Sequence, residues 1–187
     1  VGISDAAART DASVCAAADG CFHVAVVGTV AYRAAQTNGL GIVSVADRAS
    51  PVELSLYDTP SYAWEVAVDG GHAYVADGNA GLIVLDVTDP AAPTLLGEAD
   101  TPIKAVGVCA GGGRAWVADY GGGMRSYDLT VPDAPVEVAQ IPTGDYSYDL
   151  DLAGNYAYLA AYRRGLVILD VSDPYHPFET GSLDTGG

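Results

Sequence analysis

Three carboxylates in this sequence could hold a metal ion or move a proton. Asp149 and Asp151 are two residues apart in the segment DYSYDLD, and residues at that spacing on a β-strand point to the same face. Glu65 stands at the position equivalent to Asp149 in another copy of the repeat described below. Because calcium prefers several oxygen ligands, Glu65, Asp149 and Asp151 form a candidate calcium site. The alternative is that these carboxylates line a solvated channel.

Motifs that would indicate catalysis are not found in the sequence. The three histidines, His23, His72 and His176, do not have the spacing of zinc ligands. There is no G-x-S-x-G elbow, phosphate-binding loop or paired-cysteine motif. We therefore predict a non-enzymatic protein with no cofactor other than the candidate calcium ion. The alternative, an enzyme, would use Asp149 and Asp151 as acid and base.

A second set of residues suits recognition. Tyrosine and arginine dominate binding hot spots, and here they occur at positions that vary between copies of the repeat. They lie in two kinds of predicted loop on one face of the expected fold, and loops on a rigid scaffold often carry function. The candidate binding residues are Tyr62, Lys104, Tyr120, Asp145, Tyr146, Tyr162, Arg163 and Arg164. The competing interpretation is ordinary surface polarity.

The charge of the chain limits its partners. Among 187 residues, 24 are Asp or Glu and 8 are Lys or Arg, which gives a net charge of −16. Such a surface repels phosphate groups, so neither nucleic acid nor an anionic membrane is expected as a partner. No stretch reaches the 18 or more apolar residues of a membrane span, so membrane insertion is not expected. The expected partners are a protein, a surface glycan or a second copy of the chain.

The first 21 residues differ from the rest of the chain. Residues 1–21 are rich in Ala, Ser and Asp without strand-like alternation, which indicates an N-terminal arm. Cys15 and Cys21 could close a small disulfide loop in this arm, which would fit an oxidising compartment, and two free thiols are the alternative. Cys109 lies within a strand-like pattern and is expected to be a small buried residue.

The remainder of the chain is a tandem repeat. VAYRAA begins at Val30, HAYVAD at His72, RAWVAD at Arg114 and YAYLAA at Tyr156, so each start follows the last by 42 residues. Glycine, alanine, aromatic and proline columns follow the same spacing without insertion or deletion. Regularity of this kind predicts repeated supersecondary units that stack on one another.

Each repeat divides into four short apolar runs separated by Gly, Asp and Pro turn sequences. In the second copy the runs are approximately residues 63–68, 72–77, 82–87 and 94–98. Runs rich in Val, Leu, Ile and Tyr are typical of strands. The sequence therefore predicts an all-β fold, a β-propeller made of four-stranded antiparallel blades. The four expected blades cover approximately residues 22–57, 63–99, 105–141 and 147–183, within a region spanning 22–187.

Some polar residues recur in the repeat and others interrupt it. Asp86, Asp128 and Asp170 share one column, which predicts a structural role in turn hydrogen bonding because an active site would not be copied three times. Arg33 and Arg125 occupy columns that are otherwise mainly apolar or Gly. They indicate either a local exposed edge or an ion pair.

The third strand and the turn after it resemble a known family. GLIVLDVTDPAAP (Gly81–Pro93) and GLVILDVSDPYHP (Gly165–Pro177) resemble the LVIVD repeat, a bacterial propeller module related to the broader YVTN-like propellers. AYVAD (Ala73–Asp77) matches the same pattern, whereas MRSYDLTVPDAP (Met124–Pro135) and LGIVSVADRASP (Leu40–Pro51) depart from it. The resemblance implies a secreted or cell-surface location in a bacterium and a propeller fold, more than any activity.

The number of blades leaves the architecture open. Propellers have four to eight blades, so four is the minimum. The chain could be part of a larger propeller, two chains could form an eight-bladed ring, or four blades could close alone. The leading functional hypothesis is a secreted or cell-surface binding, adhesive or structural module. The alternatives are an enzyme or calcium-dependent site in the central channel, and a subunit of a homomeric assembly joined through blade edges.

Overall fold

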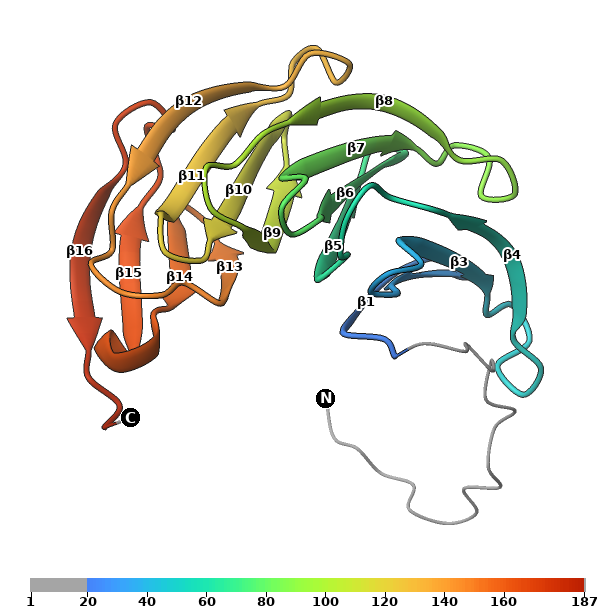
Figure 1. Ribbon diagram of the computed structural model, residues 1–187, viewed down its shortest axis with the longest axis horizontal. Coiled ribbons are helices and arrows are strands. Elements are labelled where there is room, and N and C mark those ends of the chain that lie inside the picture. The colour runs from blue at the N-terminus through green and yellow to red at the C-terminus, as the bar shows by residue number, and fades with distance from the viewer. Residues whose placement is uncertain (1–19, 187) are drawn as a thin grey trace.

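The computed structural model describes residues 20–186, which form four four-stranded antiparallel sheets arranged in an arc (Figure 1). Each sheet is a meander whose strands pair in chain order. Blade 1 contains β1 (His23–Val27), β2 (Val30–Ala34), β3 (Leu40–Ser44) and β4 (Val52–Tyr57). Blade 2 contains β5 (Glu65–Asp69), β6 (His72–Ala76), β7 (Leu82–Asp86) and β8 (Thr94–Ala99). Blade 3 contains β9 (Ala105–Gly111), β10 (Arg114–Asp119), β11 (Gly123–Asp128) and β12 (Val136–Ile141). Blade 4 contains β13 (Asp149–Ala153), β14 (Tyr156–Ala160), β15 (Leu166–Asp170) and β16 (Phe178–Leu183).

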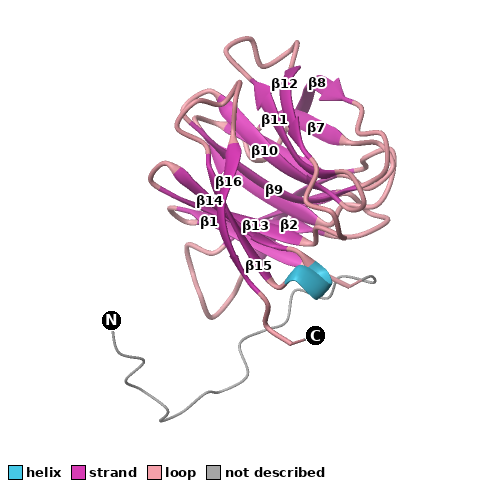
Figure 2. Ribbon diagram, turned by 90° about the vertical axis from the view of Figure 1, so that its left-hand side faces the viewer, coloured by secondary structure: helices cyan, strands magenta, loops and turns pink. Residues whose placement is uncertain are grey.

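The described residues confirm the all-β prediction and the four-stranded antiparallel blades. Their one helical element is a single 3-10 turn, η1 (Tyr162–Arg164), seen at one end of the molecule in Figure 2. The sheets do not close into a ring, because blades 1 and 4 lie at the two ends of the open arc (Figure 1). Four blades closing on themselves is therefore not the architecture observed.

The predicted N-terminal arm lies largely outside the described residues. Cys15 lies outside the described residues, and with it the choice between a Cys15–Cys21 disulfide and two free thiols. The Cys21 thiol is exposed and donates to the His23 carbonyl at 3.3 Å. The thiol of Cys109 is half-buried and donates to the Leu150 carbonyl at 2.9 Å, and burial raises its pKa to about 12. Cys109 is thus a packing residue, not a reactive thiol.

The repeated glycine before the third strand has a steric cause. Gly123 has a φ of 86°, in the left-handed region that glycine enters without strain. A Cβ added there would overlap the Ile141 carbonyl oxygen on the neighbouring fourth strand. Gly39, Gly81 and Gly165 have φ values of 71°, 77° and 71° and the same close approach to the fourth strand.

The recurring aspartates confirm the predicted turn role. The side chain of Asp86 accepts a hydrogen bond from the Thr88 N–H at 2.9 Å. Asp128 and Asp170 make the same bond to the residue two positions on, both at 2.9 Å. These Asx-turns close the chain after the third strands of blades 2, 3 and 4 and need no ligand to explain them.

The two odd arginines are explained by ion pairs. In three blades a guanidinium lies against a glutamate of the fourth strand, and the glutamates share one repeat column although the arginines do not. The pairs are Arg33–Glu53 at 2.6 Å, Arg125–Glu137 at 2.8 Å and Arg164–Glu179 at 2.6 Å. Arg125 also binds the fully buried Asp119 at 2.7 Å. The interpretation of Arg33 and Arg125 as ion-pair residues is therefore confirmed.

The core lies between the blades. We call the side of a blade that faces the next blade along the chain its leading face, and the opposite side its trailing face. The leading face of blade 1 carries Tyr32, Ala34, Leu40 and Ile42, packed on blade 2 residues that include Val66, Val75 and Ile83. Equivalent residues form the interfaces between blades 2 and 3 and between blades 3 and 4. Burying each of the larger side chains contributes about 1.5–3 kcal/mol, so the stacking of blades holds the arc rigid.

Candidate functional site

The first strand of each blade lies on the concave side of the arc (Figure 1). Glu65, at the start of β5, is 9% exposed and accepts a hydrogen bond from the Val108 N–H at 3.1 Å. Its other carboxyl oxygen lies 3.5 Å from His23 Nε2. Burial, followed by the negative charge of Asp149, raises the pKa of Glu65 to about 8. Glu65 is therefore protonated at neutral pH and can donate its proton to Asp149.

Glu65 and Asp149 belong to blades 2 and 4, and a glycine between them permits the contact. Gly107 occupies the equivalent column of blade 3. A Cβ at Gly107 would come within 3.1 Å of Glu65 Oε2 and of the Asp149 Cα. The missing side chain leaves room for the two acidic groups to meet across blade 3.

The three carboxylates of the candidate calcium site are not arranged as metal ligands. Within residues 20–186 no group of three or more His, Cys, Asp or Glu side chains could hold a metal ion. Asp151 lines the same wall, but its Oδ1 accepts the Leu152 N–H at 2.8 Å. The geometry fits an acid pair in a lined channel better than a calcium site.

Four tyrosines come together at one end of blades 3 and 4, and we call them the tyrosine patch: Tyr120, Tyr146, Tyr148 and Tyr162. The ring of Tyr146 stacks on Tyr120 at 4.4 Å between centroids. Tyr148 meets Tyr120 edge-to-face at 5.4 Å, and Tyr162 lies 5.9 Å from both Tyr146 and Tyr148. A hydrogen bond with Tyr148 raises the pKa of the Tyr120 hydroxyl. Tyr146, Tyr148 and Tyr162 are 43–49% exposed, so the rings both support one another and face solvent.

Charged groups border the tyrosine patch. The Asp145 carboxylate accepts the Tyr146 N–H at 2.8 Å and the Arg163 N–H at 3.2 Å, which ties two loops together. The Arg163 guanidinium lies over the ring of Tyr162, 5.5 Å from its centroid. A cleft of about 360 Å³ is lined by Gly121, Gly144, Asp145, Tyr146 and Arg163.

A second aromatic group lies at the start of blade 2. Phe22 and Trp64 stack with centroids 4.8 Å apart, and Tyr62 lies 5.5 Å from Trp64. The Lys104 ammonium sits 4.2 Å from the centre of the Trp64 ring, within the range of a cation–π contact. We call Phe22, Tyr62, Trp64 and Lys104 the tryptophan patch.

Backbone hydrogen bonds connect the loops that carry the two patches. The Tyr120 N–H donates to the Lys104 carbonyl at 2.9 Å, and the Ser147 N–H donates to the Tyr120 carbonyl at 2.6 Å. Asp119, fully buried, holds the same loop by accepting the Lys104 N–H at 2.7 Å. These contacts fix the patches on one continuous, pre-formed face.

The structure places the predicted binding residues in three locations. Tyr120, Asp145, Tyr146, Tyr162 and Arg163 meet at the tyrosine patch. Tyr62 and Lys104 belong to the tryptophan patch. Arg164 points away to Glu179 and to the Thr143 carbonyl, 2.7 Å from its Nη1. Its contacts are those of a residue that holds blade 4 together.

Three members of the patches were missed by the sequence analysis. Phe22, Trp64 and Tyr148 share one repeat column just before the first strand. They lie at the entry to the first strand, outside the loops in which binding residues were predicted. An aromatic column there, with Val106 as its exception, was the signal that could have found them.

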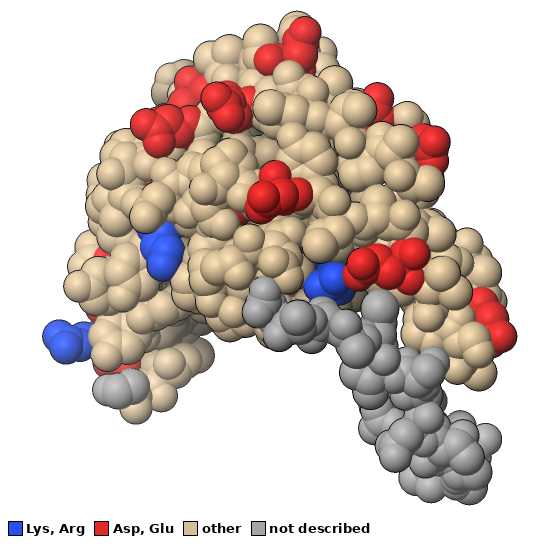
Figure 3. All heavy atoms as spheres, turned by 45° about the vertical axis from the view of Figure 1, so that its right-hand side comes forward, with Lys and Arg blue, Asp and Glu red and all other residues tan. Residues whose placement is uncertain are grey.

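Acidic side chains are scattered over one face of the molecule (Figure 3). On the face shown in Figure 3, Asp and Glu form several separate groups among few Lys and Arg side chains. Within the described residues no helix is long and apolar enough to cross a bilayer. The patches are thus local aromatic sites on an acidic background.

The 42-residue repeat can be compared with the repeats of known families. The family model described as the LVIVD repeat matches residues 22–59, 60–101 and 144–185. This chain belongs to the LVIVD repeat family. The resemblance noted in the sequence is therefore confirmed for three segments. Blade 3 of this LVIVD protein is not matched, although its four strands have the same order as those of the other blades.

Solved structures with a similar fold are distant in sequence. The computationally designed Ika4 protein is similar with a TM-score of 0.71 and 7% identity, over 84% of this chain and 95% of that one. The designed Ika8 protein has a TM-score of 0.69 and 8% identity, over 88% of this chain and 49% of that one. A functionally unknown protein from Desulfotomaculum acetoxidans DSM 771 has a TM-score of 0.76 and 13% identity, over 91% and 58%. The LVIVD chain thus spans about half the length of the Ika8 protein and of the Desulfotomaculum acetoxidans protein. No curated protein matches its sequence.

Proposed function

We propose that this LVIVD protein is a non-enzymatic, secreted or cell-surface bacterial binding module whose recognition surface is the tyrosine patch. The observation that carries the proposal is the association of four tyrosines, three of them 43–49% exposed, on loops tied by backbone hydrogen bonds. Rings held in this way lose little conformational freedom on binding, so their contact area is converted efficiently into affinity.

The chemistry of the patch favours a protein partner. Tyrosine and arginine are enriched at the centres of protein–protein interfaces, and both are present here with an adjacent carboxylate. A net charge of −16 favours partners that are neutral or basic. The carboxylates on the concave side give less support to an enzyme, because the sequence carries none of the nucleophile or phosphate-binding motifs of known catalytic sites.

The proposal is tested by removing rings from the patch. The double variant Tyr146→Ala/Tyr162→Ala is compared with Tyr156→Ala, which removes a similarly exposed tyrosine from the opposite end of β14. Immobilised chains are incubated with surface proteins of the source bacterium and with a glycan array, and the affinity of each captured ligand is then measured.

A bound protein should lose at least about tenfold in affinity with the double variant, as expected for hot-spot residues, and keep its affinity with the control. A protein that binds both variants equally would place recognition elsewhere. Patch-dependent binding of a glycan alone would show the face to be correct and the partner class to be wrong.

A further inference from the structure

The leading face of blade 4 carries the residues of a blade interface but has no described blade against it. Ala160 is exposed, whereas Ala34, Ala76 and Ala118 in the same repeat column are fully buried. The other leading-face positions, Tyr158, Leu166 and Ile168, are only partly buried, while their counterparts in blades 1–3 are 0–8% exposed.

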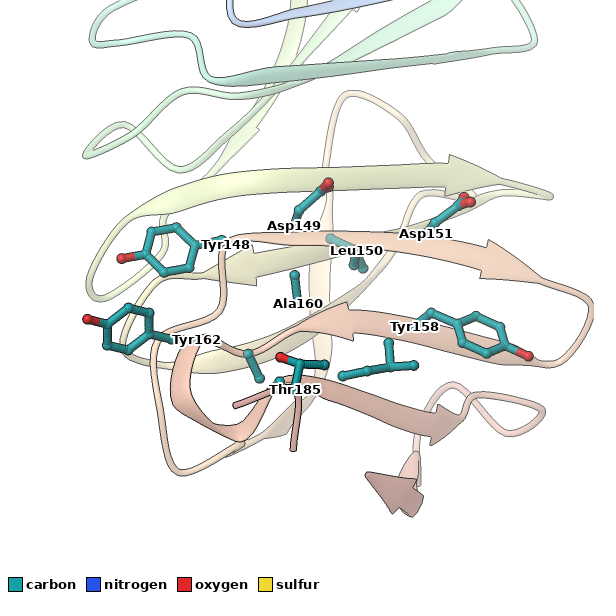
Figure 4. Close-up of a pocket in the computed structure, with 11 residues that line it drawn as sticks. Tyr148, Asp149, Leu150, Asp151, Tyr158, Ala160, Tyr162 and Thr185 are labelled. Carbon is teal, nitrogen blue, oxygen red and sulfur yellow. The ribbon is translucent and has the colours of Figure 1, made fainter. Parts of the chain in front are cut away.

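Figure 4 shows this face as an open pocket, with Tyr148 and Tyr162 at one end and Asp151 and Tyr158 at the other. Its volume is about 450 Å³, and its lining includes Ala160 and Leu166. The pocket occupies the place where, in blades 1–3, the next blade packs.

The trailing face of blade 1 is the opposite half of such an interface. Val24 on β1 is 50% exposed, whereas its counterparts Val66, Val108 and Leu150 are 0%, 1% and 3% exposed. Val26, two residues further along the same strand, is 60% exposed. Residues 20–186 therefore present one unmatched leading face and one unmatched trailing face, each with the side chains that meet in the three internal interfaces.

The residues just before the first strand of each blade show which side chains would come into contact if these two faces joined. Between blades 1 and 2, Phe22 stacks on Trp64 at 4.8 Å with only 4° between ring planes. The residue of blade 4 in that column is Tyr148, 44% exposed, and its partner in a following blade 1 would be Phe22, 50% exposed. The joint would therefore place two aromatic rings together at the border of the tyrosine patch, with Tyr146 outside the pocket that the joint fills.

Polar side chains of the first strands meet in the same way. His23 of blade 1 lies 3.5 Å from Glu65 in the equivalent position of blade 2. At the end of the arc this column holds Asp149, an exposed carboxylate, whose partner in a following blade 1 would be His23. An imidazole facing a carboxylate is a favourable pair when the imidazole is protonated.

We propose that the leading face of blade 4 docks on the trailing face of blade 1 of a second copy of this chain. Both halves of the joint are present on one chain, so the second copy supplies the matching surface for each free face. Two arcs related by a twofold axis form two identical joints and close a ring of eight blades with no free face. Closure removes the two apolar faces from water, which provides the driving force.

The test is the solution mass of the full chain by light scattering at low micromolar concentration. The expected mass is twice that of the 19.1 kDa chain. Ala160→Arg blocks the leading face and Val24→Arg blocks the trailing face, and each variant alone should be monomeric. Both residues are exposed in the single chain, so folding is preserved, as circular dichroism would verify. Ala92→Arg, in an exposed loop of blade 2, is the matched control and should remain dimeric.

Mixing the two blocked variants distinguishes this joint from other kinds of self-association. A mixture retains one intact joint, between the leading face of the Val24→Arg copy and the trailing face of the Ala160→Arg copy. It should therefore recover a mixed dimer, whereas neither variant dimerises alone. A monomeric wild-type chain, a larger polymer, a dimer indifferent to both substitutions, or a mixture without recovery would overturn the proposal.

Discussion

Glu65 is the residue whose surroundings depart most from those of an ordinary surface carboxyl. It is almost fully buried, accepts a backbone N–H from blade 3 and faces Asp149 of blade 4. One side chain of blade 2 therefore touches both following blades. This arrangement is stable while Glu65 keeps its proton, because ionisation would place two carboxylates side by side in a poorly solvated position.

Glu65→Gln should stabilise the chain at alkaline pH. The carboxyl ionises near pH 4.5 when unfolded but near pH 8 when folded, so between these values the folded state binds more protons. The free energy of unfolding of the wild type should therefore fall as pH rises through this window and then level off. Glutamine has a similar shape and no charge, so its advantage should be absent near pH 4 and reach about 3–5 kcal/mol near pH 9. Urea unfolding of both proteins across this pH range measures the difference, and a constant difference at all pH values would contradict the role given to Glu65.

At the scale of elements, turns fix where strands end. The glycine before each third strand allows the backbone to approach the fourth strand. Gly112, in the turn between β9 and β10, also has a positive φ, 60°, but has open space around its Cα. The two positions therefore separate the effect of steric overlap from the effect of backbone conformation.

Gly123→Ala should destabilise the chain more than Gly112→Ala. Both substitutions force alanine into a left-handed conformation, which costs about 1 kcal/mol. Only Gly123→Ala adds an overlap with the Ile141 carbonyl, so its total loss should be about 2–4 kcal/mol. Chemical denaturation of the two variants measures the losses, and equal values would show that blade 3 adjusts to the added methyl group.

Sequence patterns predicted the strands of the blades better than the contacts of the candidate site. The 42-residue spacing and the Gly column are repeated in every blade and the Asp column in three, so strand number and order could be predicted from local chemistry. The Arg–Glu pairs could be suspected only as oddities, because the arginine enters from a different strand or loop in each blade. Glu65 and Asp149 were predicted to share a wall, but a pKa near 8 depends on burial between blades and on the space at Gly107. Contacts of this kind arise from stacking, which one sequence does not encode locally.

At the scale of the whole molecule, negative charge opposes the compact state. The chain carries a net charge of −16, and only a few carboxylates are paired with arginine. Mutual repulsion among the others is stronger in the folded arc than in the expanded chain. Salt screens such repulsion at distances beyond the Debye length, which is about 10 Å at 0.1 M and about 3 Å at 1 M.

Sodium chloride should therefore raise the melting temperature of the chain by several degrees between about 0.05 and 0.5 M. In a chain of this size a gain of roughly 1 kcal/mol in the free energy of unfolding raises Tm by about 2–4 °C. Millimolar calcium should add no more than sodium chloride of equal ionic strength, because no group of three or more His, Cys, Asp or Glu side chains within residues 20–186 is arranged to hold a metal ion and Asp151 is bonded to its own backbone. Differential scanning calorimetry with the two salts makes the comparison. A calcium-specific rise in melting temperature that disappears in Asp149→Asn would contradict this prediction. It would show that calcium draws Glu65 and Asp149 together as ligands. A rise with both salts alike would assign the effect to general screening and leave the contact between Glu65 and Asp149 as the link across blade 3.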